Sequence, residues 1–416
     1  MRVRIHRGTR EIGGSAVELE RDGARLLLDL GLPLDGDPDD ATVHPAIEGL
    51  AGGGDLLALV LSHGHLDHVG LAHLAGPDLP VALGAATHRI LKAAAPFVPR
   101  PYLPQRAVEF SDGVPLTFGP FTVTPHLVDH SAYDAYALEV AAGDERLFYS
   151  GDLRGHGRKA ALFERLVRCA PRGVDALLLE GSCLGRLDPQ HTFPTESEIE
   201  ASFVDLFADT PGLALVSASA QNIDRMVSLY RACKRTGRTL VIDLYAAEIL
   251  RATGNPNIPQ SHWPNVAVHV PHYQRVQIKR SGRFDLLEAH KAHRIYPEAL
   301  AELAPRAALL FRPAMLRDLD RAACLTGARA VWSQWEGYLA QPRGQALQAD
   351  LATHGIPLEH VHTSGHASVP DLQRFAAALA PRALVPIHTF APERFPALFG
   401  PAVQLREDGE WWSLAA

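Results

Sequence analysis

Several features that would place this chain in a special class of protein are missing from its sequence. The N-terminal stretch MRVRIHRGTREIGG has no apolar segment of the kind that signal peptides carry. No run of apolar residues approaches the length needed to cross a bilayer, and we find no internal repeat. These absences predict a cytoplasmic protein that does not bind a membrane.

The chain is also poor in cysteine and has no excess of positive charge. Its four cysteines stand far apart and form no CxxC pair, which indicates a reducing compartment and argues against a thiolate metal site. The formal net charge is −7, so a nucleic-acid partner would have to be held by a local basic patch.

What is present is enough chain for two domains, or for one domain that carries a large insertion. The chain has 416 residues, and its first 190 contain short apolar segments broken by turn residues. Several of these predicted strands end in Asp, His or Glu followed by Gly or Ser. A layered α/β sheet presents its site residues at such strand ends.

From about residue 195 the pattern changes to helices that alternate with buried strands. A helix is predicted to open on Thr195 and Glu198, which resemble a capping box. Strands at 213–219 and 239–244 flank a second predicted helix, and this β-α-β order predicts a parallel sheet. Residues 252–283 look like a long irregular connection.

The strand-then-histidine pattern of the first part returns near the end of the chain, at 358–368 and 383–390. This return predicts one domain interrupted by another, with residues 1–190 and 341–416 forming the outer domain and residues 191–340 the insertion.

The stretch LSHGHLDHVG, residues 61–70, concentrates potential metal ligands directly after a predicted buried strand. The i, i+2 spacing of His63 and His65 puts both imidazoles on one side of an extended segment, where they can bind one ion. Asp67 and His68 follow at the start of a helix and face a neighbouring position. Nitrogen and oxygen ligands without sulfur suit zinc, with manganese or iron as alternatives.

HxHxDH is the signature of the metallo-β-lactamase superfamily, and the chain resembles that superfamily over its length. Asp29 in LLLDLG matches the early aspartate that orients the ligand loop. His130 in DHSAYD matches the third-strand histidine better than His126 does, and Asp152 in FYSGDLR matches the aspartate that bridges two metals. The resemblance implies an αββα sandwich.

The resemblance also implies a distribution of ligands over two zinc ions. His63, His65 and His130 would hold the first ion, Asp67 and His68 the second, and Asp152 would bridge them. Two such cations lower the pKa of a shared water, so that a bridging hydroxide attacks, and they stabilise both the attacking and the leaving oxygen. This chemistry suits a phosphodiester, although relatives in the superfamily also cleave lactams and thioesters.

Three later residues resemble the β-CASP subfamily of nucleases. They are Glu196 in HTFPTESEIE, His366 in HTSGHAS and His388 in LVPIHTF, and SQWEGY at 333–338 is similar to that subfamily as well. The resemblance makes His388 a ligand of the second metal. It makes Asp67, Glu196 and His366 catalytic, with His366 as general acid or phosphate contact steadied by Glu196. The alternative for His366 and His388 is a buried histidine bonded to the backbone.

Within that subfamily the chain resembles bacterial and archaeal ribonuclease J. A histidine at position 388 is typical of the RNA-processing members rather than of the eukaryotic DNA-repair members. The chain ends 28 residues after His388, so the C-terminal assembly domain of ribonuclease J is expected to be absent, which leaves a homodimer as an open option. Asp224 stands where ribonuclease J has a histidine, and exonuclease and endonuclease activity both stay open.

Two segments are candidates for contact with nucleic acid. Ser217 and Ser219 in SASAQNIDR could hold a phosphate at a helix N-terminus, although an ordinary helix cap explains them equally well. Arg275, Lys279 and Arg280 could contact the backbone of a strand, or could form a solvated loop. The histidines of this region, at positions 262, 269, 272, 290 and 293, are expected at the surface.

The sequence therefore predicts a metal-dependent ribonuclease acting on single-stranded RNA, with two Zn²⁺ ions or with Mn²⁺. The alternatives are a DNA nuclease of the same fold, a hydrolase of a small ester or thioester, and a binding protein with a decayed site. The complete ligand set argues against decay, and the inserted domain favours a polymeric substrate over a small ester.

Overall fold

A computed structural model of the chain describes residues 1–414, which form two compact units. The first unit contains Met1–Leu91, Tyr102–Phe193 and the chain from Gly365 onward, and the second contains Lys92–Pro101 and Pro194–Ser364. The sequence placed the end of the insertion at residue 340. The second unit continues to Ser364 because a strand at 358–360 pairs with that unit's sheet.

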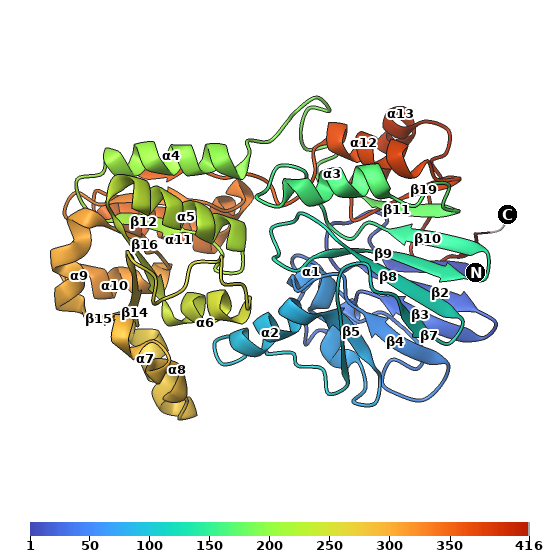
Figure 1. Cartoon of the computed structure of the whole chain (residues 1–416), viewed down its shortest axis with the longest axis horizontal. Coiled ribbons are helices and arrows are strands. Elements are labelled where there is room, and N and C mark those ends of the chain that lie inside the picture. The colour runs from blue at the N-terminus through green and yellow to red at the C-terminus, as the bar shows by residue number, and fades with distance from the viewer. Residues whose placement is uncertain (415–416) are drawn as a thin grey trace. The chain divides into compact units, whose positions relative to one another are not determined.

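Two mixed sheets form the first unit (Figure 1). One sheet has the order β20 (Trp411–Ser413), β1 (Arg2–Arg7), β2 (Ala16–Arg21), β3 (Ala24–Leu28), β4 (Leu56–Val60), β5 (Val81–Gly84) and β6 (Ala107–Phe110). The other has the order β19 (Ala383–Ile387), β11 (Ala176–Glu180), β10 (Glu145–Tyr149), β9 (Tyr136–Ala142), β8 (Phe121–Leu127) and β7 (Leu116–Phe118).

The apolar core of this unit lies in three layers. Val3, Leu28 and Val60 of the first sheet share a buried cluster with Leu138 and Leu178 of the second, so the two sheets pack face to face. The outer faces are covered by the helices of the unit, which are α1 (Leu66–Val69), α2 (Ala85–Ala94), α3 (Ala160–Cys169), α12 (Val369–Leu379) and α13 (Phe395–Phe399). The expected αββα sandwich is confirmed.

The second unit is built on one parallel sheet of seven strands. Its order is β15 (Arg294–Ile295), β14 (Val266–His269), β13 (Thr239–Asp243), β16 (Ala307–Leu310), β12 (Ala214–Ser217), β17 (Arg329–Trp332) and β18 (Leu358–His360). The helices between these strands are α4 (Glu196–Ala208), α5 (Ile223–Thr236), α6 (Leu244–Ala252), α7 (His272–Ser281), α8 (Asp285–Glu288), α9 (Pro297–Leu303), α10 (Leu316–Arg321) and α11 (Pro342–Thr353). The predicted parallel sheet is confirmed.

The local signals read from the sequence explain where the first helices of this unit begin and end. Thr195 Oγ1 accepts the Glu198 amide at 3.2 Å, and Glu198 accepts the Thr195 amide at 2.7 Å, so the capping box is confirmed. Gly237 ends α5 with φ +68°, a left-handed conformation that glycine adopts without steric cost.

Two expectations for the region after α6 were wrong. Residues 252–283 are not an irregular connection, because they contain β14 and α7, short elements whose stability comes from packing on the sheet rather than from local pattern. His269 and His290 are not at the surface and are only 3% and 4% exposed. His269 ends a buried strand, and His290 lies between Ser261 and Glu248.

None of the helices among residues 1–414 combines the length and the apolar character needed to span a membrane.

Candidate metal centre

The polar residues singled out in the first unit follow the carboxyl ends of its strands. Asp29 comes directly after β3, His63 and His65 follow β4, and His388 follows β19. These strands are buried and run parallel to a neighbour, β3 to β4 and β19 to β11, so their ends meet at one edge. The topology therefore gathers side chains that are far apart in sequence.

Asp29 fixes the segment after β4, which carries the potential metal ligands His63, His65 and His68. Its backbone has φ +56°, a left-handed conformation that is uncommon for a residue with a Cβ. One carboxylate oxygen accepts the Ser62 amide at 2.7 Å, and the other accepts Tyr149 Oη at 2.8 Å and lies 2.7 Å from His68 Nδ1. A hydrogen bond at Nδ1 leaves Nε2 of His68 as the nitrogen that faces the site.

Three histidines form the first group of potential ligands. His65 Nδ1 lies 3.2 Å from His63 Nε2 and 3.1 Å from His130 Nε2. Bonds of 2.0–2.1 Å in a tetrahedral zinc site put ligand nitrogens roughly 3.3 Å apart, close to this spacing. His130 Nδ1 donates to the Gly365 carbonyl at 2.6 Å, which fixes Nε2 as the ligand atom. His126 lies outside the group, with Nε2 3.4 Å from Glu139.

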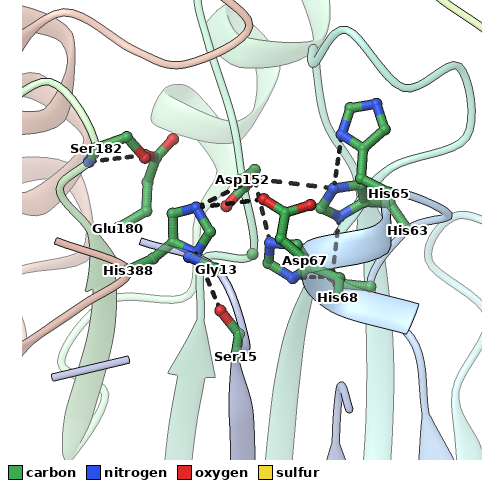
Figure 2. A network of polar contacts seen from close by, with 12 residues as sticks. Gly13, Ser15, His63, His65, Asp67, His68, Asp152, Glu180, Ser182 and His388 are labelled. Carbon is green, nitrogen blue, oxygen red and sulfur yellow. Dashed lines mark hydrogen bonds and ion pairs between the residues drawn. The ribbon is translucent and has the colours of Figure 1, made fainter. Parts of the chain in front are cut away.

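The second group consists of Asp67, His68, Asp152 and His388, whose ligand atoms all lie within 4.8 Å of one another. Asp152 Oδ2 is 3.2 Å from His68 Nε2 and 3.9 Å from His388 Nε2. The same oxygen is 3.8 Å from His63 Nε2, so it stands between the two groups (Figure 2). This is the position that a bridging carboxylate requires.

His388 is positioned by backbone geometry as unusual as that of Asp29. It has φ +54°, and its amide donates to the Gly8 carbonyl at 2.7 Å. Its Nδ1 lies 3.0 Å from Ser15 Oγ (Figure 2), a contact that leaves Nε2 directed at the carboxylates. Strained backbone at a cluster of polar residues is typical of a functional site.

Hydrogen bonding within the protein does not satisfy this cluster. His68 Nε2, His388 Nε2 and both carboxylate oxygens of Asp152 are buried and have no hydrogen-bond partner among the described residues. Buried polar atoms of folded proteins are nearly always paired, so four converging ligand atoms without hydrogen-bond partners are typical of a site that binds a cation. The donor set of imidazoles and carboxylates fits a divalent metal ion.

The electrostatics of the cluster favour metal binding. Burial lowers the pKa of four histidines, which are His63, His65, His130 and His388. Burial also opposes charge on His68, but the carboxylates of Asp152 and Asp29 outweigh it and raise the pKa of His68 well above its usual value. Burial would raise the pKa of Asp152, but the facing His388 and His68 hold it well below its usual range. The site thus offers four neutral imidazoles and the ionised carboxylate of Asp152, whereas the His68 imidazole holds its proton against that carboxylate.

His366 lies beside the cluster and is held by Glu180. Its Nδ1 is 3.2 Å from Glu180 Oε2, 3.1 Å from Ser182 Oγ and 3.8 Å from Asp152 Oδ2. Burial lowers the pKa of His366, but the carboxylates of Glu180 and Asp152 outweigh it and raise this pKa to about 9. The side chain keeps 23% of its surface exposed, so a bound substrate can reach it.

Glu180 was missed as a site residue in the sequence, although its signal was there. It is the last residue of β11, in the segment LLLEGS, which has the strand-then-acid pattern of the other site residues. Its carboxylate is only 1% exposed and accepts Ser182 Oγ at 2.7 Å and the Leu153 amide at 3.1 Å. Glu180, whose contact with Ser182 is drawn in Figure 2, therefore offers His366 a fixed acceptor.

Glu196, which the sequence assigned to steady His366, belongs to the second unit and is bound there. Its carboxylate accepts Arg225 Nη2 at 2.9 Å and Ser228 Oγ at 2.7 Å. Glu196 is 1% exposed and Arg225 is fully buried. Within the first unit, Glu180 is the acidic residue that hydrogen-bonds to His366.

The candidate nucleic-acid residues lie in the second unit. Ser217 ends β12 and is buried, and Ser219 is exposed in the loop that follows. Asn222 caps α5 by accepting the Arg225 amide at 3.1 Å, so a side chain of SASAQNIDR does cap the helix. Three basic residues lie exposed on α7, which are Arg275, Lys279 and Arg280.

The class of protein follows from a comparison of the sequence with known families. Residues 25–208 match the family described as the Beta-lactamase superfamily domain. The matched residues include the loop after β4, His130 and Asp152. Residues 25–208 therefore carry a domain of the β-lactamase superfamily, and the resemblance stated from the motifs is confirmed.

Among characterised proteins, the chain is similar to ribonuclease J. It is 28% identical over 275 residues to ribonuclease J of Mycobacterium tuberculosis, covering 60% of this chain and 47% of that protein. It is 22% identical over 412 residues to ribonuclease J of Helicobacter pylori, covering 92% of this chain and 55% of that protein. The chain thus spans about half the length of these relatives.

A solved structure extends the likeness of fold to the whole chain. The crystal structure of a protein of unknown function from Enterococcus faecalis V583 superposes with a TM-score of 0.81 at 23% identity. The superposition covers 99% of each chain, so both units of this fold occur together in another protein.

Proposed function

We propose that the protein is a metal-dependent nuclease that hydrolyses phosphodiester bonds of single-stranded RNA. The observation that carries the proposal is Asp152 Oδ2 within 3.9 Å of histidine nitrogens from both ligand groups, with His366 and Glu180 beside it. The similarity to ribonuclease J supports RNA as the substrate. In this proposal the second unit has the role of the β-CASP domain.

Two zinc ions, or two Mn²⁺ ions, would be held by the two ligand groups. His63, His65 and His130 would bind one ion, Asp67, His68 and His388 the other, and Asp152 both. When bound, such a pair of cations activates water and stabilises negative charge on the phosphate oxygens. Asp29 and the Gly365 carbonyl contribute by fixing the ring orientation of His68 and His130.

His366 would act on the leaving oxygen. Glu180 and Ser182 contact Nδ1, so Nε2 is the nitrogen that would meet the substrate in this proposal. The raised pKa keeps the imidazole protonated at neutral pH, which is the state that can donate a proton or bind a phosphate oxygen. Glu180 would then position His366 and maintain its charge.

The competing substrates are DNA and a small ester or thioester. Cleavage assays on matched substrates separate them: end-labelled single-stranded RNA, DNA of the same sequence, and a chromogenic phosphodiester, each with Zn²⁺ or Mn²⁺. We expect cleavage of RNA and loss of that activity in Asp67→Ala and His366→Ala. His126→Ala removes a histidine four residues from His130 but outside the cluster, and it should retain activity.

Other outcomes reject parts of the proposal. Cleavage of DNA alone would replace RNA as the substrate. Hydrolysis of the small diester with neither polymer cut would reject a nuclease. Metal analysis that finds well under two equivalents in fully loaded protein would reject the two-ion centre.

A further inference from the structure

A polar cavity lies in the second unit and shares no residue with the metal cluster. It has a volume of about 530 Å³. Its lining residues come from the end of β14 and from α7, α9 and α10, the elements labelled in Figure 1. Its polar lining consists of His269, His272, Arg275, Glu298, Asp318 and Arg321. Cavities of this size accommodate small-molecule ligands and cofactors.

His269 is the feature that marks this cavity as a candidate site. The residue is 3% exposed, and neither ring nitrogen has a hydrogen-bond partner among the described residues. Burial lowers the pKa of His269, so the ring is neutral and offers one donor and one acceptor. A buried imidazole without partners that lines a cavity suggests that a ligand completes its hydrogen bonds.

The charges around His269 argue against a plain anion site. Asp318 Oδ2 accepts the His272 amide at 2.8 Å, so a carboxylate already occupies the N-terminus of α7. Arg275 and Arg321 supply positive charge, whereas Asp318 and Glu298 supply negative charge in equal number. A ligand that fits this lining carries an anionic group together with an edge of hydrogen-bond donors and acceptors.

We propose that this cavity binds a nucleotide. Arg275 and Arg321 contact its phosphate, and His269, together with one of the carboxylates Asp318 and Glu298, contacts the edge of its base. A nucleobase presents donors and acceptors side by side, and guanidinium groups bind phosphate. Ala301, Ala322 and Pro297 form the apolar wall against which a base can lie. The ligand is either a free nucleotide or one nucleotide of an RNA strand, and the proposal does not depend on nuclease activity.

Isothermal titration of the full chain with AMP, GMP, CMP, UMP and inorganic phosphate tests the proposal. We expect at least one nucleotide to bind with a Kd below about 1 mM and more tightly than phosphate. Arg321→Ala and His269→Ala should each weaken this binding at least about tenfold. Arg317→Ala is the matched control, because Arg317 is exposed on the same helix and lies outside the cavity lining.

The metal centre must be separated from this cavity in the same experiment. The titration is therefore repeated in His130→Ala, which removes a cluster ligand and should leave nucleotide binding intact. Competition by a ten-nucleotide single-stranded RNA would identify the strand as the source of the nucleotide, and its absence would identify a free nucleotide. The proposal is overturned if no nucleotide saturates the protein, if phosphate binds equally well, or if Arg275→Ala and Arg321→Ala leave binding unchanged.

Discussion

The strand ends of the two units carry similar residues but differ in how completely these residues are hydrogen-bonded. In the first unit, neither carboxylate oxygen of Asp152 has a hydrogen-bond partner among the described residues. In the second unit, Asp243 at the end of β13 accepts the Ala246 amide at 2.7 Å and Arg312 Nε at 3.3 Å. Both carboxylates are essentially fully buried.

The comparison shows how to distinguish a binding site from a structural network of the same composition. Asp243 and Glu196 have their charge balanced inside the protein, by Arg312 and Arg225. The ligand atoms of the metal cluster converge with few hydrogen bonds from the described residues, so in the proposed function a bound cation completes this cluster. Removal of a residue should therefore affect activity in one unit and stability in the other.

The largest expected effect comes from the substitution Asp152→Asn. The bound metal should fall from the proposed two equivalents to one or fewer, and kcat should fall on the order of 10⁴-fold, as it does when a central catalytic group is removed. Asp243→Asn is the matched change in the second unit. It should keep the metal content and lower the free energy of unfolding by about 1–3 kcal/mol. Metal analysis, kinetics and denaturant unfolding measure these effects, and a loss of metal in both variants would break the distinction.

The two buried glutamates give the next contrast. Glu180→Gln should lower kcat by about 10–100-fold, the usual effect of changing a residue that orients a site histidine. Glu180 raises the pKa of His366, and the protonated ring is the proposed donor. In Glu180→Gln the pKa of His366 should be lower, so the fall in activity at alkaline pH should begin at a lower pH than in the unmodified protein. The pH profile of kcat measures this shift.

Glu196→Gln should instead affect folding, since it leaves Arg225 buried without its carboxylate. Breaking a buried ion pair of this kind costs about 3–5 kcal/mol. Thermal and denaturant unfolding report the loss, and the metal content should equal that of the unmodified protein. A shifted pH profile in Glu196→Gln, with none in Glu180→Gln, would favour Glu196 as the residue that steadies His366, as expected from the sequence.

A smaller effect is expected for the stability of the second unit at acid pH. Burial would raise the pKa of Glu248, but hydrogen bonds from His290 and Arg251 outweigh it and lower this pKa. A carboxyl with a lowered folded-state pKa stabilises the fold above its unfolded pKa of about 4.3, and this stabilisation is lost as pH falls through the folded value. The destabilisation in Glu248→Gln, about 1–3 kcal/mol at pH 7, should therefore shrink below about pH 4. Unfolding curves at stepped pH measure it, and a constant difference would contradict the pairing.

The smallest effect concerns the exposed basic residues of α7. Arg280→Ala should weaken RNA binding by a few-fold and reduce the slope of log K against log salt by roughly 0.7, the contribution of one contact with a single strand. Filter binding across a salt series measures the slope. An unchanged slope would show that Arg280 is a solvated residue, and Arg317→Ala provides the baseline.

Much of the fold could be read from the sequence because its signals are local. The capping box at Thr195, the glycine after α5 and the buried strands before His63 and His388 each depend on a few neighbouring residues. β14 and α7 escaped detection, since short elements surrounded by Pro and Asn form only when the rest of the sheet packs against them.

The sequence by itself determined which residue types could bind a metal, because His63, His65, Asp67 and His68 lie within six positions of one another and need no tertiary information. Only the tertiary structure decided which distant side chains meet. It brought Glu180 to a hydrogen bond with His366, it paired Glu196 with Arg225, and it buried His269 at a cavity where a surface residue was expected. The physical reason is that hydrogen bonding and desolvation depend on distances between strand ends, and the order of strands in a sheet sets those distances.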